Sequence, residues 1–246
     1  MRLLLLPICG LVMLAGASCT AHGASPPQTA SSNPKHVPRT PIDRKKAELG
    51  QNTWNPQWNE IVEQALPASL LSEQVPRDVR RFCPRFFTMS DTEKRTFWAY
   101  FFQALAGAEA GLNPQATVRH DEPKLARREK VAATRVRTEG LLQLTYADQT
   151  RYGCPFDEQA DRGLPAEDPA RTILQPKNNL SCGVMILENQ LITQRKPLLS
   201  PTSYWATLRP GTISYRIFAK QMTNPPAACG LHVRGRRKAF PKQIAQ

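Results

Sequence analysis

The segment from Ser90 to Pro114 constrains the fold more than any other part of the chain. Ser90 and Glu93 have the spacing of a capping box, in which each side chain accepts a hydrogen bond from the other residue's backbone N–H. A stripe of large apolar residues follows at helical spacing: Phe97, Trp98, Phe101, Phe102 and Leu105. Gly111 and Asn113-Pro114 are expected to end the helix, because proline disfavours helical geometry in the residue before it. The segment predicts a long helix with one face in the core.

Two further stretches predict helices. Ile61, Val62, Ala65 and Leu66 recur at helical spacing before Pro67, and Leu180, Val184, Leu187 and Leu191 do so after Asn178-Asn179. The stretch from Arg119 to Arg137 is highly charged and has no convincing apolar face. No internal repeat and no extended alternating pattern is present. The expected fold class is therefore mainly α, in a single domain.

The N-terminus has the layout of a secretory signal peptide. Arg2 precedes an apolar run from Leu3 to Leu14, which is shorter than the roughly 20 apolar residues that span a bilayer. Two cleavage patterns fit. Ala15-Gly16-Ala17 has the small residues of ordinary signal cleavage, whereas Gly16-Ala17-Ser18-Cys19 resembles a lipobox, in which Cys19 is the lipidation candidate. The chain is expected in the periplasm, with anchoring to the outer membrane through a lipidated Cys19 as one alternative.

The remaining organisation follows from composition. Residues 19–50 contain few large apolar side chains and many Pro, Ser and Thr, so a disordered tether is expected after a signal peptide at 1–18. Residues 51–230 are expected to form the domain, and 231–246 a basic tail without a single acid. The formal net charge of +13 favours a polyanionic partner. No nucleic-acid recognition motif is present, so no nucleic acid is expected.

Four cysteines remain when Cys9 and Cys19 are set aside: Cys83, Cys154, Cys182 and Cys229. An even number in an exported chain predicts two disulfides, with three pairings open. No pair has the spacing of a zinc-binding motif and the four histidines are scattered, so no metal site is expected.

Glu109 is the candidate for catalysis. Counting back from it in steps of four gives Leu105, Phe101 and Phe97, so the periodicity places Glu109 on the apolar face of its helix. Burial of this kind raises the pKa of a carboxyl group, and a protonated carboxyl can donate to a glycosidic oxygen. A solvent-facing glutamate at a frayed helix end is the alternative.

Three blocks of sequence carry a resemblance to one family. Glu109-Ala110-Gly111-Leu112-Asn113-Pro114 resembles the Glu-Ser-Gly-Phe-Asn-Pro signature of soluble lytic transglycosylases and goose-type lysozymes. Gly140-Leu141-Leu142-Gln143-Leu144 is similar to the Gly-Leu-Met-Gln-Ile motif of that family. Asn179-Leu180-Ser181-Cys182-Gly183 resembles its third block. The order and rough spacing match, over less than half of the chain.

The resemblance implies a lysozyme-like fold, α+β with minimal β, and a single catalytic acid/base at Glu109. It also implies that Gln143 sits beside the acid in the substrate groove and that Gly140 lets the backbone approach the glycan. Leu142, Tyr146 and Tyr204 are the other residues predicted to contact substrate. In place of the family's late Tyr-Asn-Ala-Gly-like block, this chain has Tyr204-Trp205-Ala206-Thr207, which is a departure.

The implied reaction is cleavage of the β-1,4 bond between N-acetylmuramic acid and N-acetylglucosamine, without metal or organic cofactor. A lytic transglycosylase produces 1,6-anhydro ends, whereas a lysozyme uses water. Glu139 and Asp148 are candidates for the second carboxylate that water activation requires, and solvated surface acids are the alternative. A non-catalytic wall-binding or assembly protein is a further alternative.

The blocks also suggest a disulfide pairing. Cys154 follows the second block and Cys182 lies in the third, so we expect these two to pair and leave Cys83 with Cys229.

Overall fold

The computed structural model describes residues 52–120 and 136–230, and these form a mainly helical domain. The predicted signal peptide at 1–18, the tether at 19–50, the lipidation candidate Cys19 and the basic tail at 231–246 lie outside the described residues, as does most of the charged stretch between Arg119 and Arg137.

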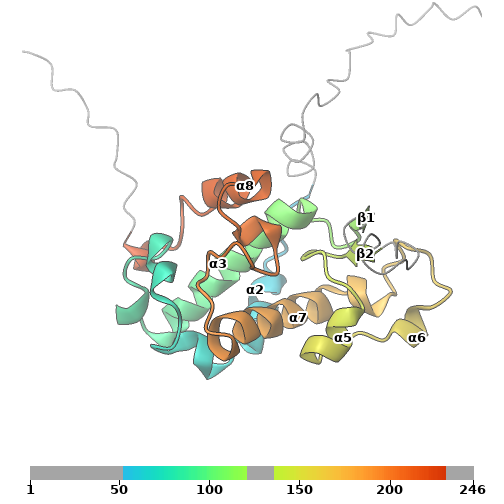
Figure 1. Cartoon of the computed structure of the whole chain (residues 1–246), viewed down its shortest axis with the longest axis horizontal. Coiled ribbons are helices and arrows are strands. Elements are labelled where there is room, and N and C mark those ends of the chain that lie inside the picture. The colour runs from blue at the N-terminus through green and yellow to red at the C-terminus, as the bar shows by residue number, and fades with distance from the viewer. Residues whose placement is uncertain (1–51, 121–135, 231–246) are drawn as a thin grey trace, which may run out of the picture. The chain divides into compact units, whose positions relative to one another are not determined.

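The long helix predicted from the capping box is α3, Asp91–Ala110 (Figure 1). Both capping hydrogen bonds are present: the Ser90 backbone N–H donates to Glu93, and the Glu93 backbone N–H donates to the Ser90 hydroxyl. The helix ends at Gly111, whose φ of 61° is a left-handed conformation that glycine adopts at little cost. The whole predicted stripe is fully buried: Phe97, Trp98, Phe101, Phe102 and Leu105. This helix is therefore the centre of the core.

Other helices pack around α3. The helix α2, Gln57–Ala65, contacts both α3 and α7, Pro176–Glu188. The helix α7 begins at Pro176, before the predicted Asn178-Asn179 start, because proline is well suited to the first turn of a helix. The helix α8, Ile213–Gln221, packs on α3, with Phe218 in edge-to-face contact with Phe101. These contacts enclose the aromatic stripe of α3.

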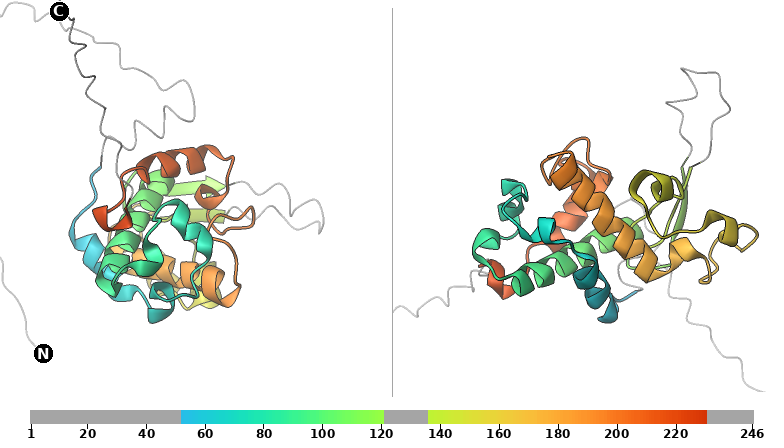
Figure 2. Two further views of the ribbon diagram at one scale, coloured as in Figure 1. Left: turned by 90° about the vertical axis from the view of Figure 1, so that its left-hand side faces the viewer. Right: turned by 90° about the horizontal axis from the view of Figure 1, so that it is seen from below.

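Two strands form the sheet of the described chain (Figure 2). Strand β1, Thr117–His120, pairs antiparallel with β2, Val136–Glu139, with Thr117 opposite Glu139. The sequence analysis did not predict these strands, because each has only four residues and they flank the charged stretch. Strand β1 begins seven residues after the end of α3, so it is close to Glu109 in the sequence.

Short elements complete the domain. The helices α5, Ala147–Tyr152, and α6, Glu158–Asp161, follow β2. A π-helical turn, Asn189–Thr193, continues α7 and buries Leu191. Single turns of 3-10 helix lie at Ala68–Leu71, Arg77–Arg81, Phe86–Thr88, Thr172–Leu174, Ala206–Leu208 and Ala227–Cys229.

The described residues contain two disulfides, in the predicted pairing. Cys83 is bonded to Cys229 with the Cα atoms 4.5 Å apart, and Cys154 is bonded to Cys182 with the Cα atoms 4.8 Å apart. Disulfides persist in oxidising compartments, so the chain belongs to an exported environment. None of the helices in the two described ranges has both the length and the apolar composition of a membrane span.

Gly183 allows α7 to pack closely on its neighbours. A Cβ atom at this position would lie 2.1 Å from a methyl carbon of Leu142 and 3.1 Å from a ring carbon of Phe102. Both of these side chains are fully buried, so neither has room to move aside. Glycine is therefore required where α7 meets the turn that follows β2.

We expect Gly183→Ala to lower the free energy of unfolding by about 2 kcal/mol, measured by urea denaturation. Overpacking of this severity costs about 3 kcal/mol, and the better helix propensity of alanine offsets about 1 kcal/mol. Gly107→Ala in α3 is the matched control, because its added Cβ would meet only the side-chain amide of the partly buried Gln221. Equal stability of the two variants would contradict the role given to Gly183.

Candidate functional site

A cleft of about 330 Å³ lies where α3 ends and β1 begins. Its polar lining comes from Asn52, Glu109, Asn113, Gln115, Thr117 and Glu167, and its apolar lining from Ala110, Ala116 and Val118. Amides, a hydroxyl and carboxylates provide both donors and acceptors of hydrogen bonds. The cleft therefore suits a ligand with many hydroxyl or amide groups.

Glu109 lies in the last turn of α3 and is partly buried. Its neighbours in the sequence, Ala108 and Ala110, are buried, and Glu109 lines the cleft. The sequence predicted that Glu109 lies on the apolar face of its helix, with a solvent-facing glutamate as the alternative, and the partly buried side chain lies between these two expectations.

Thr207 contacts Glu109 directly. Its hydroxyl donates a hydrogen bond to Oε1 of Glu109, and Thr207 itself is fully buried in the 3-10 turn Ala206–Leu208. A buried donor on a separate element restricts the orientation of the carboxyl group. Tyr204 was predicted from the sequence to contact substrate, and Thr207 was not. Thr207 lies in the same four-residue segment, which differs from the late motif of the resembling family, and that difference was a usable signal.

Gln143 links the turn after β2 to the wall of the cleft. Its side-chain amide donates to the backbone oxygens of Gly140 and Ala116, at 2.9 and 3.2 Å, and its Oε1 accepts from the Thr138 hydroxyl at 2.9 Å. Gln143 also has a positive φ of 51°, a strained conformation for a residue with a side chain. Only 8% of Gln143 is exposed. The polar groups of Gln143 are thus used to join this turn to the cleft wall at Ala116.

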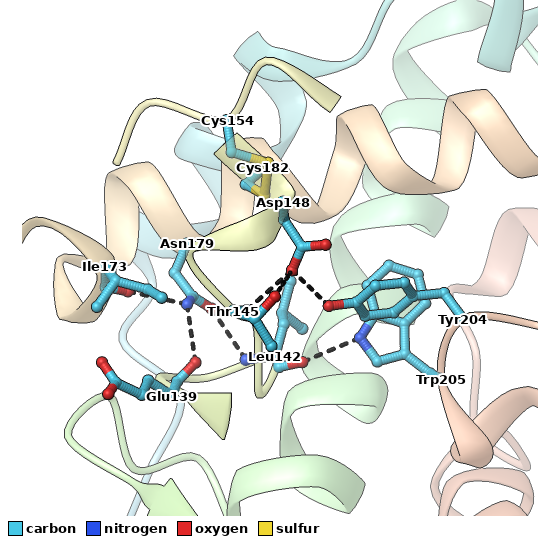
Figure 3. The surroundings of a disulfide bond; sticks show 10 residues. All are labelled: Glu139, Leu142, Thr145, Asp148, Cys154, Ile173, Asn179, Cys182, Tyr204 and Trp205. Atoms are coloured by element: carbon cyan, nitrogen blue, oxygen red, sulfur yellow. Dashed lines mark hydrogen bonds between the residues drawn. A yellow bond between two sulfur atoms is a disulfide. The ribbon is translucent and has the colours of Figure 1, made fainter. Parts of the chain in front are cut away.

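Asn179 joins the turn to α7 (Figure 3). Its Nδ2 donates to the backbone oxygens of Glu139 and Ile173, and its Oδ1 accepts from the backbone N–H of Leu142, at distances from 2.9 to 3.2 Å. Gly140 has a φ of 76°, and a Cβ there would lie 2.3 Å from Nδ2 of Asn179. Gly140 therefore allows the backbone to lie close to the side chain of Asn179.

Glu139 is buried in an ion-pair cluster. Its carboxyl lies 2.9 Å from the Arg171 guanidinium and 3.5 Å from that of Arg137, and 2% of the side chain is exposed. Burial raises the pKa of Glu139, and the two arginines oppose part of that effect. Glu139 does not line the cleft that contains Glu109.

Asp148 is also buried, and Oδ2 accepts three hydrogen bonds: from the Thr145 backbone, the Thr145 hydroxyl and the Tyr204 hydroxyl, at 2.8, 3.0 and 2.6 Å (Figure 3). Burial raises the pKa of Tyr204, and the charge of Asp148 adds to this effect, so the phenol keeps its proton and donates a hydrogen bond to Asp148. Trp205 donates from its indole to the backbone oxygen of Leu142 at 2.9 Å. These contacts brace the turn after β2 and lie apart from the lining of the cleft.

Tyr146 and Leu142 occupy internal positions as well. The Tyr146 hydroxyl donates to Asp161 at 2.5 Å and accepts from Arg171 at 2.9 Å, while Leu142 is fully buried. Of the residues predicted to act on substrate, the structure thus brings Glu109 to the cleft and places Gly140, Leu142 and Gln143 in a turn that bonds to the cleft wall at Ala116. Tyr146 and Tyr204 hold other parts of the framework through their hydroxyl groups.

Glu167 is a carboxylate that the sequence analysis did not single out. It is exposed and lines the same cleft as Glu109, although the two are 58 positions apart in the chain. No sequence motif surrounds Glu167, so no local signal marked it. No cluster of three or more His, Cys, Asp or Glu in the described ranges has the arrangement of a metal site.

Comparison with solved structures shows the fold of DslA (Bd0314). The wild-type protein and one of its glutamate-to-glutamine variants each match with a TM-score of 0.57 at 23% sequence identity, covering 73% of this chain and 94% of DslA. A second glutamate-to-glutamine variant of DslA matches with a TM-score of 0.55 over 70% and 91% of the two chains, again at 23% identity. No protein-family model matches the chain, and no curated protein does.

We expect Asn179→Leu to lower the free energy of unfolding by about 3 kcal/mol or more, measured by thermal and urea denaturation. The leucine would leave one buried N–H and two buried carbonyl oxygens without the bonds that Asn179 makes, at about 1 kcal/mol or more each. Asn178→Leu is the control. Asn178 is only partly buried and donates to Thr172 and Gln175, so its replacement should cost about 1 kcal/mol. A smaller loss for Asn179→Leu than for the control would refute the role of Asn179.

Proposed function

We propose that this chain cleaves the glycan strands of peptidoglycan at the β-1,4 bond between N-acetylmuramic acid and N-acetylglucosamine, with Glu109 as acid/base. The observation that carries the proposal is the placement of the Glu109 carboxyl in a polar cleft, where a buried threonine hydroxyl fixes its orientation. A carboxyl group held in this way can deliver a proton to one chosen oxygen of a bound sugar.

The three resembling blocks meet in space, which supports a lysozyme-like fold. The Gly140 backbone N–H donates to the Ala116 oxygen at 2.8 Å, which links the second block to the segment after the first. Asn179, at the start of the third block, bonds to Leu142 in the second. Segments that are far apart in the chain thus form one continuous structure beside Glu109.

The reaction needs only one protein carboxyl group. Glu109 donates its proton to the glycosidic oxygen, and the bond from that oxygen to C1 of the muramic acid breaks. The acetamido oxygen of the muramic acid bonds to C1 as the leaving sugar departs. Glu109, now a carboxylate, accepts the proton of the C6 hydroxyl, whose oxygen displaces the acetamido oxygen from C1. The product is a 1,6-anhydro end, and Glu109 regains its starting form.

The amides near Glu109 have a role in this scheme. Asn52, Asn113 and Gln115 line the cleft and can bond to sugar hydroxyl and acetamido groups. Such bonds would hold the glycosidic oxygen within reach of Glu109, which is the positioning that makes a single acid effective. Gln143 acts one step away, by fixing the backbone of Ala116 in the wall of the cleft.

The proposed location is the periplasm, reached by the N-terminal signal. Lipidation of Cys19 would add an outer-membrane anchor to the enzyme. A hydrolytic muramidase on the same fold would share the first proton transfer with the lytic transglycosylase. A wall-binding or assembly protein would share the cleft but would not need the proton of Glu109.

We expect Glu109→Gln to abolish the release of muropeptides from purified peptidoglycan, measured by mass spectrometry. Glutamine has nearly the same shape but no acidic proton, and general acid–base catalysis contributes roughly 100-fold to 10,000-fold in rate. Sedimentation with peptidoglycan is measured in parallel, because binding should persist. Equal release by the wild type and the variant, with binding retained by both, would favour the wall-binding protein.

Thr207→Val should lower kcat about tenfold and leave KM nearly unchanged. The substitution removes the hydroxyl that orients Glu109 while it keeps a side chain of similar shape, and a hydrogen bond to a charged group is worth about 1.5 kcal/mol or more. Thr207→Ser retains the hydroxyl and should retain most of the rate. A full rate for Thr207→Val, in a protein with unchanged melting temperature, would show that the hydrogen bond has no catalytic importance.

A further inference from the structure

Glu167 is the one carboxylate besides Glu109 that lines the cleft in the described part of the chain. The two other candidates have different partners. The carboxyl of Glu139 is paired with Arg171 and Arg137, and the carboxyl of Asp148 accepts three hydrogen bonds in the interior. Glu167, in contrast, is exposed.

The loop that carries Glu167 is fixed on both sides of that residue. On one side, the Arg171 guanidinium donates to the backbone oxygen of Ala166 at 2.8 Å. On the other side, the Asp168 backbone N–H donates to Pro165 at 3.1 Å and its carboxylate accepts from the Ala170 backbone at 2.9 Å. Glu167 therefore projects from a defined turn.

Arg171 connects this turn to the part of the cleft lining that contains Thr117. Only 5% of Arg171 is exposed, and its guanidinium is paired with Glu139 at 2.9 Å. Glu139 lies opposite Thr117 in the two-stranded sheet, and Thr117 lines the cleft. A buried ion pair contributes little net stability, since desolvation of both charges offsets their attraction. The series of contacts from Thr117 through Glu139 and Arg171 to Ala166 instead fixes the position of Glu167 relative to the cleft.

We infer that Glu167 is a second catalytic carboxylate, which orients a water molecule toward C1 and so gives the enzyme a hydrolytic product in addition to the anhydro product. This inference rests on the proposed function of the cleft. Glu109 belongs to α3 and Glu167 to the loop before α7, and both residues line the same cleft. Water attack on a glycosidic carbon requires an acid and a base in one substrate cleft, and these two carboxylates supply both.

In the hydrolytic step, a water molecule replaces the departing sugar at C1. Glu109 gives its proton to the glycosidic oxygen, and the C1–O bond breaks with its electron pair on the departing sugar. The water oxygen bonds to C1, and one water proton passes to the Glu167 carboxylate. The product is a reducing end with a hydroxyl at C1. Glu167 then returns its proton to solvent and Glu109 takes one up, so the net reaction consumes one water.

The test compares the products of the wild type and Glu167→Gln on purified peptidoglycan. The released muropeptides are treated with borohydride, which reduces reducing ends but leaves 1,6-anhydro ends unchanged, and both are quantified by mass spectrometry. We expect the rate of formation of reducing ends to fall about 100-fold in the variant, as removal of a general base predicts. The formation of anhydro ends should stay close to the wild-type rate, because the C6 hydroxyl gives its proton to Glu109.

Glu158→Gln is the matched control, with the same change of charge at an exposed glutamate of α6 that does not line this cleft. It should leave both products unchanged. Three outcomes would overturn the role of Glu167: a wild type that forms anhydro ends alone, an unchanged product ratio in Glu167→Gln, or an equal fall of both products. In each of these the cleft still cleaves glycan and the proposed function stands. If the wild type releases no muropeptide at all, the proposed function fails and this inference fails with it.

Discussion

The hydrogen bonds of one buried asparagine determine how the domain is assembled around its cleft. Asn179 bonds to the backbone at Glu139, Leu142 and Ile173, so it joins β2, the turn after it and the chain before α7. Because Asn179 is fully buried, none of these backbone groups has water as an alternative partner. Gly140 and Gly183 provide the space for this arrangement, since a Cβ on either would overlap Asn179 or Leu142. The turn after β2 is therefore fixed from within the core.

The distribution of carboxylates follows from the same framework. Glu139, Asp148 and Asp161 are buried and serve as acceptors or ion-pair partners for arginine, tyrosine and threonine. Burying so many charged groups is costly unless each has several partners. Their partners connect the turn after β2, the loop before α7 and the segment around Tyr204. The carboxylates that line the cleft are Glu109, which Thr207 orients, and Glu167.

Local patterns predicted much of the architecture. The capping box at Ser90 and the aromatic stripe that follows it placed α3 correctly, because hydrogen bonds between near neighbours set helix ends and burial selects one face. The disulfide pairing was also confirmed. The strands β1 and β2 were missed, because each has only four residues and fifteen residues separate them in the sequence. They are strands only because they pair with each other.

The sequence by itself determined the mainly helical class, the two disulfides and the position of Glu109 at the end of a buried helix, because these depend on periodicity and on groups close along the chain. Only the tertiary structure decided the surroundings of Glu109. It brought Thr207 to the carboxyl and Glu167 to the cleft, and it engaged Glu139, Asp148 and Tyr204 inside the protein. A local pattern contains no information on which distant backbone or guanidinium a polar side chain will meet. Those contacts determine whether a carboxylate is a buried structural residue or an exposed base.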